Sequence, residues 1–254
     1  GDDLLLVDDY CHNSIMMGGR ATRATVKSFR HNDLDHLDQL LASHRAAHRN
    51  CLIAVESLYS MDGDWVELPR LLEVRDRHGA WLMVDEAHSF GVMGATGRGI
   101  SEHYGEDPRR IDLIVGTLSK TLASSGGFVC AHGLAVEWLR FTLPGFVFSV
   151  GLSPAVITGA HAALRALIDE PERVTRLAAN AEMFVAKANA LGLSTGAAMG
   201  RGIVPVIFPD FPTTLAKAAA LLERGVYAPP VIQVGVPQDA PRIRFFLSAD
   251  HSEA

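Results

Sequence analysis

The chain has 254 residues, of which 48% are hydrophobic and 20% are charged, and its formal net charge at pH 7 is −6. This composition is typical of a globular protein that forms one large domain or two modest ones. The acidic balance, with no basic run, argues against nucleic acid or an acidic membrane surface as a partner. No apolar run is as long as a membrane-spanning helix, so we expect no membrane span.

Short apolar runs alternate with helical patterns along the first part of the chain. The runs that predict buried strands span residues 4–8, 51–56, 80–85, 111–116 and 127–132. Helical periodicity covers residues 34–47 and 68–78, and ATVKSF at residues 24–29 is a candidate edge strand. Continuous apolar strands with helices between them predict an α/β fold with a mainly parallel sheet, covered on both faces. Functional sites in such sheets lie beyond the carboxyl ends of the strands.

The second part of the chain predicts a smaller α+β domain. An amphipathic helical pattern covers residues 154–191 and is interrupted by DEPER at 169–173. A strand pattern at 202–208, a helix at 214–223 and a strand at 241–248 follow. We predict a large domain over residues 1–153, connecting helices over 154–197 and a partial small domain over 198–254. Both ends of the chain resemble positions inside a fold, so we expect it to be truncated at both ends.

The three cysteines, Cys11, Cys51 and Cys130, are far apart and lack the spacing of metal ligands. An odd number of scattered cysteines favours buried, reduced thiols in a cytoplasmic protein.

One lysine stands in an unusual sequence context. Lys120 lies in GTLSKTLASSGG, just past a predicted buried strand, among small and hydroxyl-bearing residues. A desolvated lysine has a lowered pKa and can form a Schiff base, while neighbouring hydroxyls can hold a phosphate. A lysine that caps or pairs within a loop would give the same local pattern, which therefore does not separate the two hypotheses.

The segment VDEAH favours the first of these hypotheses. Asp85 ends a predicted buried strand and His88 follows it, so the acid could pair with a pyridinium nitrogen and the histidine with a ring hydroxyl. The alternative is a structural acid at a strand end beside a satisfied histidine. The same four residues, DEAH, also form the Walker B motif of one helicase class. That class needs an upstream phosphate-binding loop, which this sequence lacks, and Ser119 stands where such a loop requires glycine.

Several motifs occur in a fixed order along nearly the whole chain. The longest are VDEAHSFGVMGATGRGISEHYG at 84–105, DLIVGTLSKTLASSGGFV at 112–129 and PGFVFSVGLSP at 144–154. Shorter ones are HNSI at 12–15, FRHNDLDHLDQLL at 29–41, ESLYSMDGD at 56–64 and RIRFFLSADH at 242–251. Together they resemble the α-oxoamine synthases, which have the aspartate aminotransferase-like fold type I and use pyridoxal 5'-phosphate (PLP). The family includes 8-amino-7-oxononanoate synthase, glycine C-acetyltransferase and serine palmitoyltransferase.

The resemblance implies a PLP-dependent acyltransferase. Such an enzyme condenses glycine, alanine or serine with an acyl-CoA or acyl-carrier-protein thioester, in most members with loss of carbon dioxide, to give an α-amino ketone. The alanine-using 8-amino-7-oxononanoate synthase type is our default expectation. The resemblance also implies a cytoplasmic homodimer in which the two subunits share each active site.

The family's functional residues match positions of this sequence. Lys120 matches the lysine that holds the cofactor covalently and acts as the base. Asp85 matches the acid on the pyridine nitrogen, and His88 matches the histidine that donates to the phenolic oxygen. His12 matches the histidine stacked on the ring, and Thr117 matches a phosphate ligand.

Four further residues match positions that contact the substrate, the cofactor or the second subunit's cofactor. Arg244 matches the arginine that binds the substrate carboxylate through two hydrogen bonds. Ser60 matches a serine that contacts the cofactor. Ser149 and Val150 match a segment that reaches the neighbouring subunit's cofactor.

Two other functions stay open. An aminotransferase of the same fold would also use Lys120 and Asp85. The chain could instead be a non-catalytic subunit or an inactive fragment, because the family's leading segment and the last helices of its small domain have no match in the sequence.

Overall fold

The computed structural model describes residues 1–231, 235–237 and 239–252. By their contacts these residues fall into two compact units, the first formed by Gly1–Leu58 and Val66–Pro171 and the second by Tyr59–Trp65 and Glu172–Ala254. The short segment Tyr59–Trp65 thus groups with the C-terminal part of the chain. The domain limits that we placed at residues 153 and 197 stay a prediction.

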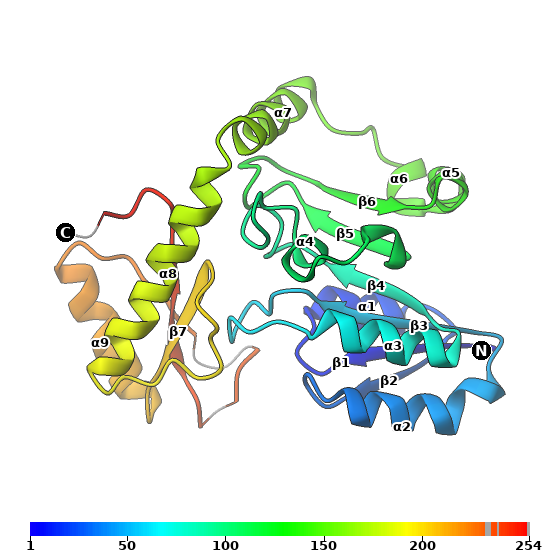
Figure 1. Ribbon diagram of the computed structural model, residues 1–254, viewed down its shortest axis with the longest axis horizontal. Helices are drawn as coiled ribbons and strands as arrows, with labels where there is room; N and C mark the ends of the chain where they lie inside the picture. The colour runs from blue at the N-terminus through cyan, green and yellow to red at the C-terminus, as the bar shows by residue number, and fades with distance from the viewer. Residues whose placement is uncertain (232–234, 238, 253–254) are drawn as a thin grey trace. The chain divides into compact units, whose positions relative to one another are not determined.

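The first unit is a single sheet with helices on its two faces (Figure 1). Its strands are β1 Asp3–Asp8, β2 Thr25–Phe29, β3 Asn50–Glu56, β4 Trp81–Asp85, β5 Leu113–Thr117 and β6 Gly127–Ala131. Its helices are α1 Asn13–Arg20, α2 Leu34–His44, α3 Leu68–His78, α4 Ile100–Tyr104, α5 Gly133–Thr142, α6 Pro144–Val147 and α7 Pro154–Asp169, with 3₁₀ turns at Arg45–Ala47 and Pro108–Arg110.

The strand order is β2-β1-β3-β4-β5-β6, and every neighbouring pair is parallel except β5 and β6. The prediction of a mainly parallel α/β sheet is therefore confirmed. The candidate edge strand at residues 24–29 is β2, which forms one edge of the sheet. The parallel strands all point the same way, so β1, β3, β4 and β5 bring their carboxyl ends to one side of the molecule.

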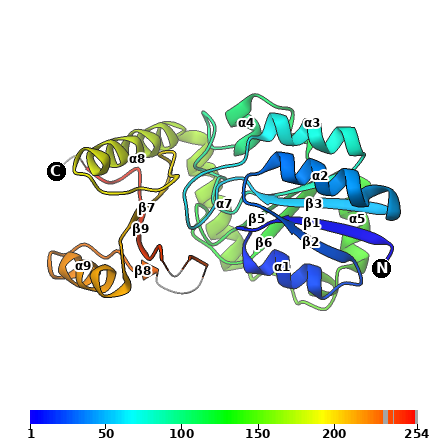
Figure 2. The same ribbon diagram turned by 90° about the horizontal axis from the view of Figure 1, so that it is seen from below.

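The two faces of this sheet are covered unequally. In Figure 2, α2, α3 and α4 lie over one face and α1 lies over the other. The face beneath α2 and α3 is fully buried, as Leu6, Ile53 and Leu82 show. On the α1 side, Leu5 and Met83 are only half-buried.

Local signals explain where the covering helices begin and end. Asp33 caps α2, because its carboxylate accepts a hydrogen bond from the His36 backbone N–H at 2.8 Å. Helix α3 carries a proline in its first turn and ends at Gly79, which has a φ of 57° and so takes the left-handed conformation that favours glycine. Both helices then direct leucines at the sheet, including Leu37 and Leu71.

The second unit is a small α+β assembly. It contains α8 Glu172–Ala190, β7 Ile203–Ile207, α9 Phe211–Glu223, β8 Pro230–Val231 and β9 Arg242–Phe246. The strands form an antiparallel sheet in the order β7-β9-β8. The predicted smaller α+β part is confirmed, and β8 is an addition that sequence reasoning missed. No helix among the described residues is long and apolar enough to cross a bilayer.

The three cysteines differ in accessibility, contrary to the expectation that all are buried. Cys11 and Cys51 are buried, whereas Cys130 on β6 is exposed. Burial raises the pKa of the Cys51 thiol to about 11. Burial also raises the pKa of Cys11, and the nearby carboxylates of Asp8 and Glu56 raise it further.

We expect a thiol reagent at pH 8 to modify Cys130 first, since the thiolate is the reactive form. Cys11 and Cys51 should react more slowly by about 10²-fold or more in the folded chain, and at the rate of Cys130 after unfolding. Mass spectrometry of alkylated peptides over time measures this. Equal labelling of all three thiols in the folded chain would contradict the burial of Cys11 and Cys51.

Candidate functional site

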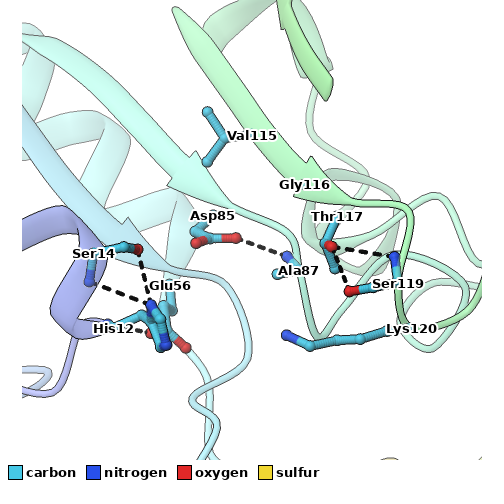
Figure 3. A pocket seen from close by; sticks show the side chains of 10 residues that line it. All are labelled: His12, Ser14, Glu56, Asp85, Ala87, Val115, Gly116, Thr117, Ser119 and Lys120. Carbon is cyan, nitrogen blue, oxygen red and sulfur yellow. Dashed lines mark hydrogen bonds between the residues drawn. The ribbon is translucent and has the colours of Figure 1, made fainter. Parts of the chain in front are cut away.

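A cavity of about 350 Å³ lies beyond the carboxyl ends of β3, β4 and β5 (Figure 3). Its volume is in the range of sites that bind small molecules and cofactors. The polar side chains that line it are His12, Ser14, Glu56, Asp85, Thr117, Ser119 and Lys120. The structure therefore brings together four of the residues that the sequence singled out: His12, Asp85, Thr117 and Lys120.

Asp85 is the last residue of β4 and places a carboxylate in the cavity (Figure 3). Its Oδ1 accepts a hydrogen bond from the Ala87 backbone N–H at 2.8 Å. Burial raises the pKa of this carboxyl, while that hydrogen bond and the charges of Lys120 and His12 act in the opposite direction. The charged form of a half-buried acid of this kind is stabilised by a cationic group placed beside it.

Thr117 ends β5, and Ser119 and Lys120 lie in the loop that follows this strand. The Lys120 side chain extends toward the side of the cavity on which Asp85 and His12 lie (Figure 3). Thr117 Oγ1 and Ser119 Oγ are 2.7 Å apart, and the Ser119 backbone N–H donates to Thr117 Oγ1 at 3.1 Å. Lys120 is exposed, so this chain alone does not desolvate it as the sequence hypothesis requires.

His12 is fixed at the start of α1. It is the N-cap of that helix, where its Nδ1 accepts from the Ser14 backbone N–H at 3.3 Å and lies 2.8 Å from Ser14 Oγ. Its own backbone N–H donates to Glu56 Oε1 at 2.5 Å. The residue is exposed, which leaves its ring accessible to a ligand in the cavity.

Glu56 is a cavity residue that sequence reasoning missed. It ends β3, pairs in register with Asp85 of β4, and is only 3% exposed. A signal was present, because the predicted strand at 51–56 ends in an acid just as the strand at 80–85 does. Ser119 was also not chosen, although the hydroxyl-rich context of Lys120 was recognised.

His88 is not among the residues that line this cavity. It lies half-buried in the turn that follows β4. Its predicted role at the ring hydroxyl therefore stays a prediction.

Ser60 and Arg244 lie together in the second unit. Arg244 Nη1 donates to the Ser60 backbone carbonyl at 2.7 Å, although 184 positions separate the two residues in the chain. The guanidinium carbon of Arg244 lies 4.6 Å from the centre of the Phe246 ring. Burial lowers the pKa of Arg244. Two residues predicted to contact the cofactor and the substrate are thus neighbours.

Ser149 and Val150 lie in the connection between α6 and α7, and both are exposed. The exposure of Val150 is 106%, and that of the neighbouring Phe148 is 86%. Neither residue is among those that line the cavity, and their predicted contact with a second subunit stays a prediction.

The chain is similar to curated relatives and to solved structures. The 8-amino-7-oxononanoate synthase of Beijerinckia indica subsp. indica is 36% identical over 251 residues, which is 99% of this chain and 63% of that protein. The solved serine palmitoyltransferase of Sphingomonas wittichii superposes with a TM-score of 0.92 at 31% identity, over 99% of this chain and 63% of that one. A second solved serine palmitoyltransferase, which carries PLP, gives the same TM-score of 0.92, identity of 31% and coverage of 99% and 63%.

The chain thus spans 63% of the length of these relatives. They confirm the resemblance to the α-oxoamine synthases and the predicted fold. The sequence model of the family described as aminotransferase class I and II matches residues 1–254. The chain belongs to the aminotransferase class I and II family.

Proposed function

We propose that the protein is a PLP-dependent acyltransferase of the α-oxoamine synthase type. It transfers the acyl group of a thioester to the α-carbon of a small amino acid, which releases the thiol and carbon dioxide and gives an α-amino ketone. The observation that carries this proposal is the cavity in which Lys120 and Asp85 lie with two hydroxyls and an accessible histidine. Relatives named 8-amino-7-oxononanoate synthase are similar to the chain, and the family resemblance implies alanine as the amino acid for that type.

The residues of the cavity fit PLP by their chemistry. A half-buried carboxylate whose pKa is raised by burial, Asp85, suits a protonated pyridine nitrogen. The adjacent hydroxyls of Thr117 and Ser119 are donors for a phosphate. An accessible imidazole at His12 suits stacking on a flat ring, and the amine of Lys120 suits a bond to an aldehyde.

Each residue then has a stated task. When bound, PLP supplies a ring that withdraws electrons from the α-carbon of the amino acid. Lys120 Nζ takes the proton from that carbon and later returns one to the product. Asp85 keeps the ring nitrogen protonated. Arg244 binds the amino acid's carboxylate, which it can do through two parallel hydrogen bonds.

The active enzyme is a cytoplasmic homodimer in this proposal. The exposed segment around Ser149 and Val150, with the apolar side chains beside it, reaches the cofactor of the second subunit. His88 donates to the cofactor's phenolic oxygen, and Ser60 contacts the cofactor. The acyl donor is a thioester of coenzyme A or of an acyl carrier protein.

The reaction itself tests the proposal. The purified chain is incubated with PLP, with glycine, alanine or serine, and with acyl-CoA esters of increasing length. We expect free thiol, carbon dioxide and an α-amino ketone to form in equal amounts, and only when both substrates are present. A keto acid formed from the amino acid without any thioester would instead identify an aminotransferase. If neither the α-amino ketone nor the keto acid forms, the proposed activity is wrong.

A further inference from the structure

The segment Tyr59–Trp65, here called the 59–65 loop, is held against the small sheet by several bonds. The Met199 backbone N–H donates to the Gly63 carbonyl at 3.1 Å. Gly63 has a φ of 70°, and a Cβ on it would clash with the Ile203 carbonyl oxygen. Only glycine allows so close an approach in that conformation. The loop is thus fitted to β7 by its backbone.

Arg242 of β9 binds the same loop with a buried side chain. The residue is 2% exposed, and its Nη1 donates to Asp62 Oδ1 at 2.6 Å and to the Met61 carbonyl at 3.1 Å. The Asp62 side chain is 17% exposed. A buried ion pair recovers little net stability after desolvation, and its best-attested use is to select one arrangement of the chain. Here that arrangement is the position of the 59–65 loop.

Arg244 differs from Arg242 in the hydrogen bonds and ion pairs that its guanidinium forms. Alternate residues of a strand share one face, so both arginines reach the 59–65 loop from β9. Arg244 donates Nη1 to the Ser60 carbonyl at 2.7 Å and contacts Met61 Sδ at 3.5 Å. Among residues 1–231, 235–237 and 239–252, its Nε has no hydrogen-bond partner and no ion pair includes its guanidinium. Arg242 thus forms an ion pair with Asp62, whereas Arg244 has no acidic partner among these described residues.

We propose that Arg242 and Asp62 position Arg244 for the substrate carboxylate. Their ion pair fixes the 59–65 loop, and the Ser60 carbonyl on that loop then holds one nitrogen of the Arg244 guanidinium. The guanidinium is thereby held in one orientation for the carboxylate. Arg242 and Asp62 are positioning residues, and the inference rests on the proposed role of Arg244 in amino acid binding.

The kinetic test uses Asp62→Asn with a matched control. This substitution keeps the size of the side chain and removes its charge. The control is Glu182→Gln, which removes the charge from a second ion pair of the same unit, Arg201 Nη1 to Glu182 Oε1 at 2.7 Å. We expect Asp62→Asn to raise KM for the amino acid about tenfold, the effect of one misplaced charge-assisted hydrogen bond. The thioester KM and kcat should change less than about twofold, and Glu182→Gln should change none of them.

A second measurement needs neither cofactor nor substrate. Two backbone amides of the loop form hydrogen bonds within it, Tyr59 to the Asp64 carbonyl at 2.8 Å and Gly63 to the Tyr59 carbonyl at 3.0 Å. Hydrogen exchange at these amides should be faster in Asp62→Asn and in Arg242→Lys than in the parent chain. It should be unchanged in Glu182→Gln.

The outcomes separate the inference from the proposed function. Faster exchange with an unchanged amino acid KM would overturn the positioning role while leaving the acyltransferase proposal intact. If Asp62→Asn lowers both kcat and thermal stability and again leaves KM for the amino acid unchanged, the ion pair has only a structural role. This result would also overturn the positioning role. A parent chain that converts no amino acid with any thioester would overturn the proposed function, and the positioning role with it.

Discussion

Replacing Lys120 with alanine should lower turnover of amino acid and thioester by about 10²–10⁴-fold, the range expected when a positioned acid–base group is lost. Lys120 supplies the amine of the cavity that holds Asp85 and the Thr117 and Ser119 hydroxyls. In the proposed mechanism, its removal would take away both the covalent anchor for PLP and the base that moves the α-proton. The protein should remain folded, because the residue is exposed.

Lys217→Ala is the matched control for this experiment. Lys217 is an exposed lysine on α9, where alanine is a good helix former. Turnover, thermal unfolding and borohydride fixation of PLP followed by peptide mapping are compared in the two variants. We expect the fixed cofactor on residue 120 in the parent and in Lys217→Ala, and no fixed cofactor in Lys120→Ala. Retained turnover in Lys120→Ala, or a label on another lysine of the parent, would show that the assignment is wrong.

The strands were predictable because they are continuous apolar runs. Predicted strands at 51–56 and 127–132 are observed as Asn50–Glu56 and Gly127–Ala131. The direction of β6 was not predicted, because apolar runs carry no information on strand direction. Only the length of the connection does so: residues 118–126 are too few for the crossover of about a dozen residues or more that a parallel neighbour needs.

Helix α1 was missed for a reason that its packing explains. Its sequence, NSIMMGGR, contains two glycines, which lower helix propensity. Yet a Cβ on Gly19 would lie 2.6 Å from Leu5 Cδ2 of β1. The residue that weakens the helix locally is thus the one that lets it approach the sheet, and this tertiary requirement cannot be read from periodicity.

The site, too, has a part that the sequence predicts and a part that it does not. His12, Asp85 and Lys120 converge because each lies at or just past the carboxyl end of a parallel strand of one sheet, and these ends meet at one edge. No such rule predicts that Ser60 and Arg244 are neighbours, because 184 positions separate them in the chain. Only the family resemblance pointed to them. The buried pair of Arg242 and Asp62 had no sequence signal, since burial and partner choice appear only in the folded chain.

Asp85→Asn should change activity and stability in opposite directions. Asparagine keeps an oxygen that can accept from the Ala87 N–H but removes the charge that, in the proposed mechanism, keeps the ring nitrogen of PLP protonated. We expect turnover to fall by about 10–10²-fold, the cost of one charge-assisted hydrogen bond. Asp9→Asn, an exposed residue near the same edge of the sheet, is the control and should leave turnover unchanged.

Stability in the absence of PLP follows from the direction of the pKa shift. Burial raises the pKa of Asp85 in the folded chain, so the folded state binds this proton more tightly than the unfolded state does. The resulting stabilisation is complete below the unfolded carboxyl pKa of about 3.9 and is lost as the pH rises through the folded value. Asp85→Asn has no such loss. Its melting temperature relative to the parent should therefore rise between pH 4 and pH 8, whereas that of Asp9→Asn should follow the parent. A variant that melts below the parent at pH 8 would contradict this expectation. It would show that the charged Asp85 carboxylate stabilises the folded chain even without a cationic ring beside it.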